Sequence, residues 1–181
     1  MNRLPFQFYY FHPTPIVAAR VPCDQDIPRL IDAAYDILTA VHAAYRSEHV
    51  QQKGLHGDAS SALTAWCLYA GSSTSNYAWM LRTAQELCNE YAFRFPTRNR
   101  HPKESAFQNR AGIGMPPAAL TNATPGIPPD LAYQYGGDTP QQRFCTAYLF
   151  FHIRDDAIWT NRSPSVEPCR QIASNVWQLA I

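Results

Sequence analysis

The sequence has few charged residues and lacks the motifs of common metal and nucleotide sites. Lys, Arg, Asp and Glu make up only 16% of its 181 residues, and the formal net charge is +1. Because the charges nearly balance, the uniformly basic surface of a histone-like protein is excluded, and any contact with nucleic acid must be local. The patterns HExxH, GxxxxGK[ST], GxGxxG and GxSxG are all missing. Zinc-protease, P-loop, Rossmann and nucleophile-elbow sites are therefore not expected.

Disulfide and membrane signals are also scarce. The five cysteines are odd in number and include no CxxC pair, which argues against a zinc ribbon or a secreted disulfide framework and fits a reducing compartment. No apolar run approaches the ~20 residues that span a bilayer, and the first residues contain no uninterrupted apolar signal segment. We therefore expect a cytoplasmic protein without a membrane contact, a metal or a cofactor.

Hydrophobic residues make up 46% of the chain and aromatic residues 13%, which is enough for one buried core at this length. The expected fold is mainly α. It is a single-domain helical bundle over 1–181, with a short N-terminal strand over 6–11, an irregular Pro/Gly-rich loop over 112–139 and a C-terminal tail over 160–181. Apolar spacing and helix-start signals predict helices over 15–20, from Asp26 to about Ser47, from Asp58 or Ser60 to Ala70, from the run Ser72 to Ser75 through Phe95, from Thr139 to Phe151 and from Pro168 to Leu179.

The most informative stretch is a basic and aromatic segment from Phe93 to Lys103, which holds four of the fifteen Lys and Arg residues. Cations attract phosphate, and the rings of Phe93 and Phe95 can stack on a base. The alternative is a solvated basic loop whose charge complements the C-terminal end of the preceding helix. The residues predicted to bind phosphate or nucleic acid are Arg20, Arg94, Arg98, Arg100, His101 and Lys103.

Acidic residues gather around the start of the first long helix. Asp32 and Asp36 lie four residues apart on one face, where like charges repel, and closely spaced carboxylates suit general acid or base work. Asp24 and Asp26 lie where a helix N-terminus favours carboxylates, which is a structural explanation for them. The candidate catalytic residues are Asp24, Asp26, Asp32 and Asp36. Glu86, Glu90 and Arg94 form a ladder of ion pairs that would line a polar pocket if buried.

Several motifs resemble those of a family of small, largely uncharacterised bacteriophage proteins. The family pattern is a strand, Asp-Pro-Asp-Pro, a short helix, Cys-Asp-Lys-His and a helix with an early Glu. Here Phe11-His12-Pro13-Thr14-Pro15 and Cys23-Asp24-Gln25-Asp26 follow that pattern without a gap, while Asn76-Tyr77-Ala78-Trp79 resembles the family's Asn-Tyr-x-Trp. Thr64-Ala65-Trp66 and Glu90-Tyr91-Ala92-Phe93-Arg94-Phe95 resemble two further family motifs. The candidate pocket residues on these motifs are Trp66, Asn76, Tyr77 and Glu90.

The family's Asp-Lys-His, followed by its Glu, is in turn similar to the acidic-helix motif of the endonuclease V type of pyrimidine-dimer DNA glycosylase. That similarity implies an all-helical, DNA-processing fold in which a carboxylate on the first long helix assists cleavage of a base from its sugar. This chain has Asp26 in place of the His and Ala33 in place of the Glu. The glycosylase-like site it implies is therefore degenerate, unless Asp32 or Asp36 substitutes.

Together these patterns predict a phage-type protein that binds nucleic acid or a nucleotide phosphate and processes DNA bases or nucleotides. The segment from Arg94 to Lys103 is expected near Asp24 to Asp36, across a pocket bordered by the loop over 112–139. The alternative is a non-enzymatic interaction protein that neutralises a host factor or sequesters a nucleotide signal, favoured by the missing Glu and His and by many Tyr, Trp and neutral polar residues. The expected partners are nucleic acid, a nucleotide or a host protein, in the host cytoplasm if a phage encodes the chain.

Overall fold

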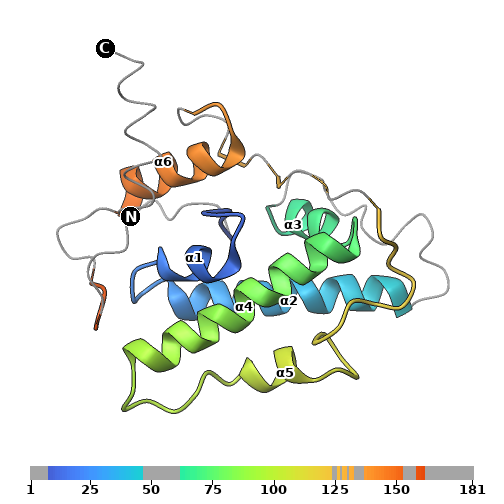
Figure 1. Ribbon diagram of the computed structural model, residues 1–181, viewed down its shortest axis with the longest axis horizontal. Coiled ribbons are helices and arrows are strands. Elements are labelled where there is room, and N and C mark those ends of the chain that lie inside the picture. The colour runs from blue at the N-terminus through green and yellow to red at the C-terminus, as the bar shows by residue number, and fades with distance from the viewer. Residues whose placement is uncertain are drawn as a thin grey trace.

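The computed structural model describes residues 8–46, 62–123, 126, 128–129, 131–132, 137–152 and 158–161. These residues form six helices and no strand, so the mainly helical fold is confirmed for this part of the chain. The helices are α1 (Pro15–Arg20), α2 (Ile27–Arg46), α3 (Ala62–Ala70), α4 (Thr74–Arg94), α5 (Glu104–Gln108) and α6 (Pro140–His152) (Figure 1). None of the described helices combines the length and apolarity needed to cross a membrane.

The two long helices, α2 and α4, form the centre of the fold. They pack against each other, and α4 also contacts α1, α3 and α5, so that it touches four other helices (Figure 1). Apolar side chains recur along both helices at spacings of three and four, and each helix therefore buries one stripe. The buried stripe of α2 comprises Ile27, Leu30, Ile31, Ala34, Ile37, Leu38 and Val41, and that of α4 comprises Tyr77, Met80, Leu81, Ala84, Leu87 and Cys88.

Helices α1, α2, α4 and α6 begin where the sequence predicts. Ser73 is the N-cap of α4, because its Oγ accepts a hydrogen bond from the backbone N–H of Asn76 at 3.1 Å. Thr139 has the same relation to α6, with its Oγ1 3.2 Å from the backbone N of Gln142. Such caps satisfy a backbone donor that has no partner within the helix. Thr14 precedes α1, but its side chain makes no capping hydrogen bond.

The N-terminal strand is not found in the described residues. Residues 8–11 form no strand, and the rest of the expected strand lies outside the described residues. The ring of Phe8 packs edge-on against Trp66 of α3 at 5.4 Å between centroids, and that of Phe11 packs against Tyr148 of α6 at 4.9 Å. Because these rings are buried against helices, the segment reaches the core without a partner strand.

The described residues between 112 and 139 form turns and irregular chain, without helix or strand. Part of this segment is attached to the central helices. The hydroxyl of Tyr77 donates to the carbonyl of Ile113 at 2.7 Å, and a ring nitrogen of His42 lies 2.8 Å from the carbonyl oxygen of Met115. These contacts hold the chain across α2 and α4 after α5. The helix predicted to begin at Pro168 lies outside the described residues.

Candidate nucleic-acid interface

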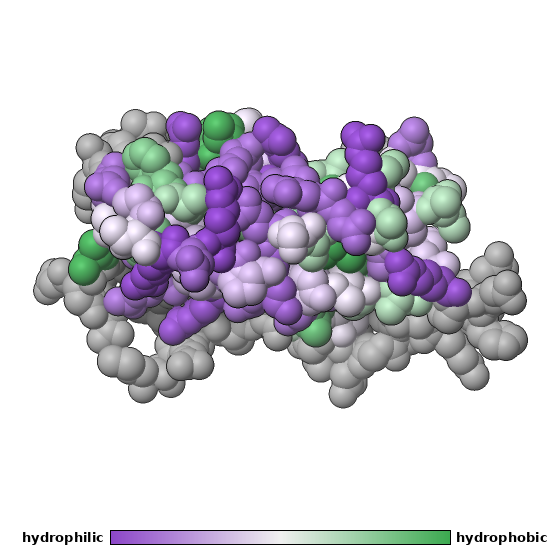
Figure 2. Space-filling view, turned by 90° about the horizontal axis from the view of Figure 1, so that it is seen from below, coloured by the Kyte–Doolittle hydropathy of each residue, from purple (hydrophilic) through white to green (hydrophobic). Residues whose placement is uncertain are grey.

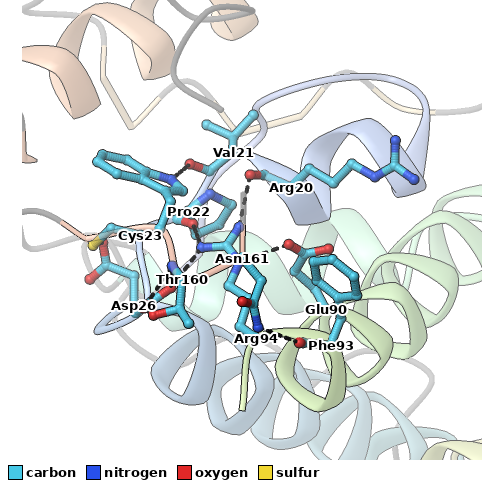
Figure 3. A network of polar contacts seen from close by, with 12 residues as sticks. Arg20, Val21, Pro22, Cys23, Asp26, Glu90, Phe93, Arg94, Thr160 and Asn161 are labelled. Atoms are coloured by element: carbon cyan, nitrogen blue, oxygen red, sulfur yellow. Dashed lines mark hydrogen bonds and ion pairs between the residues drawn. The ribbon is translucent and has the colours of Figure 1, made fainter. Parts of the chain in front are cut away.

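Arg94 lies at the end of α4, and its side chain is fully buried. Its Nε donates to Glu90 at 2.7 Å. Its terminal nitrogens donate to the carbonyls of Pro22 and Arg20, at 2.8 and 3.1 Å, and to the carboxylate of Asp24 at 3.1 Å (Figure 3). The planar guanidinium, with several fixed donors, suits this arrangement. Arg94 therefore ties α4 to the turn between α1 and α2, and it does not face a phosphate as the sequence predicted.

Asp24 receives further hydrogen bonds from the segment 158–161. Both of its carboxylate oxygens lie 3.1 Å from the backbone N of Thr160, and the Thr160 hydroxyl donates to it at 2.6 Å. Beside it, the indole N–H of Trp159 donates to the carbonyl of Val21 at 3.1 Å. Predicted as a catalytic residue, Asp24 instead joins three parts of the chain through Arg94 and Thr160.

Asp26 is also buried, and its carboxylate accepts hydrogen bonds inside the protein. It is 5% exposed, and its Oδ2 accepts hydrogen bonds from the Cys23 thiol at 3.2 Å and from the Tyr148 hydroxyl at 3.0 Å. Burial raises the pKa of Cys23 to about 11, with Asp26 adding to the rise, and burial likewise raises the pKa of Tyr148 well above its ordinary value. Both groups therefore keep their protons near neutral pH and donate them to the carboxylate. Asp26 links the start of α2 to α6.

Asp32 and Asp36 are exposed on α2. Their carboxylates are therefore open to solvent, as the predicted catalytic role requires. Asp32 faces the chain that follows α4, since its Oδ1 lies 3.8 Å from Nε2 of the buried His101. Burial lowers the pKa of His101 below its ordinary value, while Asp32 opposes this shift. His101 thus fixes the chain beside α2, with its ring edge-on to Tyr91 at 5.5 Å, and its buried ring is not positioned as a surface phosphate ligand.

We call residues Phe95 to Lys103 the basic segment; it connects α4 to α5. The guanidinium of Arg98 lies 4.5 Å above the ring of Phe95, and Arg100 pairs with Glu104 at 2.7 Å. Lys103 lies 3.9 Å above the Tyr35 ring of α2. Both arginines are exposed, and the side of the molecule on which the segment and α5 lie is mostly hydrophilic (Figure 2). Lys103 and His101 place the segment beside α2, near Asp32, whereas the predicted pocket bordered by the loop over 112–139 stays a prediction.

A hollow of about 200 Å³ lies between α1 and α4, and we call it the α1–α4 hollow. It brings together Arg20 and Glu90, which the sequence had placed in separate groups of candidates. Figure 3 shows the Arg20 side chain extending away from the Arg94 network. Glu86 also lines the hollow, as the sequence predicts for this ladder if it is buried. The sequence alone did not assign Ile16, Ala19, Asn89 and Phe93 to a pocket, although the position of Phe93 outside the buried stripe of α4 is a visible signal. The lining comprises Ile16, Ala19, Arg20, Glu86, Asn89, Glu90 and Phe93.

The other predicted pocket residues lie in the interior. Trp66 is fully buried among the rings that cover α3 and α6. The Asn76 amide donates to the carbonyl of Tyr69 and to the hydroxyl of Ser72, at 3.2 and 2.9 Å. Tyr77 is buried and holds the chain after α5. These three side chains stabilise the helix packing, and Glu90 alone of the predicted pocket set lines the hollow.

The cysteines of the described residues are buried free thiols. Burial raises the pKa of Cys67 to about 11 and that of Cys88 to about 12, so both remain protonated and act as apolar packing groups. Within the part of the chain that the structure describes, no three His, Cys, Asp or Glu side chains form a group able to hold a metal ion.

Comparison of the chain with protein-family models, with curated proteins and with solved structures gave no match. The resemblance to the bacteriophage family and to the glycosylases therefore stays a prediction.

Proposed function

We propose that the protein binds single-stranded nucleic acid through the basic segment, with Arg98 and Arg100 contacting phosphates. The supporting observation is that Arg98 and Arg100 are both exposed and lie on a segment of chain that is attached to α2. Lys103 and His101 attach the segment to α2, and Arg98 lies over Phe95. An anchored segment loses less conformational entropy on binding than a mobile loop would, so its cations are partly preorganised.

Two features favour a single strand over a duplex. The protein is nearly neutral, so it can neutralise few phosphates, whereas tight duplex binding draws on many. Phe93 is 47% exposed and lies on the last turn of α4, just before the basic segment, and the faces of bases are open to stacking only in an unpaired strand.

The proposal concerns binding, because two of the four candidate catalytic carboxylates are occupied. A general acid or base must come within hydrogen-bonding distance of its substrate. Asp24 and Asp26 instead accept hydrogen bonds from neighbouring protein groups. Asp32 and Asp36 are exposed, and any glycosylase-type turnover would depend on them.

The test is fluorescence anisotropy with a labelled oligothymidylate, compared with a duplex of the same length. The proposal predicts saturable binding to the single strand that is weakened in Arg98→Ala/Arg100→Ala. The matched control is Arg46→Ala/Arg110→Ala, which removes the same charge from exposed sites outside the basic segment. Equal affinities of the two double variants would discard the basic segment as the binding site.

A further inference from the structure

The size of the α1–α4 hollow limits what it can hold. Its volume of about 200 Å³ is below the roughly 300–1,000 Å³ of sites for drug-sized ligands. A whole nucleotide therefore does not fit within it, whereas one small planar group does. The hollow is lined by the last turns of α4, and the basic segment begins directly after that helix.

The charges around the hollow disfavour an ammonium or guanidinium guest. Glu86 is paired with Arg82, and Glu90 with Arg94, each at 2.7 Å. Arg20 also lines the hollow and would repel a cation. Since each carboxylate is already neutralised by its own arginine, an added positive charge gains little there. A neutral group with N–H donors suits these acceptors better.

One wall of the hollow offers a stacking surface. Phe93 is 47% exposed, and Ile16 across the hollow on α1 is 42% exposed. Large exposed side chains that line a concave site are available to a planar guest. Nucleic-acid bases stack on aromatic rings in this way, and the stacking tolerates any base. The Phe93 ring therefore favours a planar base as the ligand, but it does not distinguish one base from another.

The polar part of the hollow offers a carboxylate to the edge of a base. The carboxylate of Glu86 is 8% exposed and accepts hydrogen bonds from Arg82 and, at 3.2 Å, from the Asn89 amide. A carboxylate has about four acceptor positions, so Glu86 can accept more. Guanine presents two neighbouring donors, N1–H and the 2-amino group, on its Watson–Crick edge. Adenine and cytosine present one amino group beside an acceptor nitrogen, and they match a carboxylate less well.

We propose that the α1–α4 hollow binds a base of the single-stranded nucleic acid and prefers guanine, with Phe93 stacking on the base and Glu86 accepting from its edge. Arg20 is then placed for a phosphate of the same strand. This inference rests on the proposed function. Phe93 and Arg98 are five residues apart, at most about 18 Å of chain, so a short strand can reach both the hollow and the basic segment.

The first test uses oligothymidylates that carry one central guanine, hypoxanthine or adenine. Wild type should bind the guanine strand most tightly, and hypoxanthine, which lacks the 2-amino group, should fall between guanine and adenine. Phe93→Leu keeps an apolar side chain without the ring and should weaken binding of all three strands about fivefold to hundredfold. Phe93 is half exposed, and a matching unfolding curve would show that the variant is folded.

The second test asks whether the Glu86 carboxylate distinguishes guanine from adenine. Glu86→Gln keeps the shape but replaces one acceptor by a donor, and it should lower the affinity ratio of guanine to adenine toward one. The control Asp138→Asn removes an exposed carboxylate outside the hollow and should leave the ratio unchanged.

The outcomes separate this inference from the proposed function. If wild type binds the three strands equally, or if Phe93→Leu and Glu86→Gln behave as wild type while Arg98→Ala/Arg100→Ala loses binding, the base site is overturned and the phosphate contacts stand. If wild type binds none of the strands, the proposed function fails first.

Discussion

Replacing Arg94 with methionine tests whether this residue holds the fold together. The change removes four hydrogen bonds and leaves Glu90, which is 4% exposed, without its guanidinium partner. Breaking a buried ion pair in this way costs about 3–5 kcal/mol, because the remaining charge is desolvated. For a chain of this size 1 kcal/mol corresponds to roughly 2–4 °C in Tm, so Tm should fall by about 6–20 °C.

Arg82→Met provides a matched control on the same helix. Arg82 pairs with Glu86 at 2.7 Å, the same distance as in the Arg94–Glu90 pair, but the Arg82 side chain is 64% exposed. An exposed pair contributes about 0–1 kcal/mol. Urea denaturation followed by circular dichroism gives both free energies of unfolding. Adding Glu90→Met to Arg94→Met should restore part of the loss, since the buried carboxylate that has lost its guanidinium is then removed as well.

If Arg94→Met lowers the free energy of unfolding no more than Arg82→Met does, the interpretation that buried Arg94 holds the fold together is refuted. That result would show that Arg94 reaches solvent in solution, where a phosphate could bind it.

Three further changes follow from the contacts described above. Burial lowers the pKa of His101 below the ordinary value of 6.5. The neutral ring therefore stabilises the fold fully above pH 6.5, and this stabilisation is lost as the pH falls through the lowered pKa. Tm of His101→Phe should decline less between pH 7.5 and 5 than Tm of wild type. Tyr148→Phe removes the hydroxyl that donates to Asp26 and accepts from the Cys23 amide, and urea denaturation should show a loss of about 1–3 kcal/mol; no loss would mean that water replaces it. Ser73→Ala removes the α4 N-cap and should cost about 1 kcal/mol, whereas Ser73→Gly should cost less.

The sequence predicts the long helices well because local signals determine them. Apolar spacing identifies the buried stripes of α2 and α4, and the capping residue Ser73 marks the start of α4. The expected strand fails within residues 8–11 because β propensity describes how side chains fit a sheet, and these rings pack on helices instead. The short helix α5 carries too little periodicity to be recognised in advance.

The site was less predictable because its residues depend on tertiary contacts. Arg94 belongs to a basic stretch, and nothing local reveals that the carbonyls of Arg20 and Pro22 surround it. The hydrogen-bond partners of Asp24 and Asp26 likewise include Thr160 and Tyr148, which are more than 100 residues away in the sequence. Exposure of Arg98 and Arg100, in contrast, follows from their position in a polar turn.

The central claim is that exposed cations of the basic segment bind phosphates of a single strand. The most direct measurement is the slope of log affinity against log salt concentration for an oligothymidylate. Each phosphate contact to a single strand contributes about 0.7 to this slope, so Arg98→Ala/Arg100→Ala should flatten it by about 1.4. Arg46→Ala/Arg110→Ala, which removes two exposed cations outside the basic segment, should keep the wild-type slope, and the same slope in all three proteins would contradict the claim.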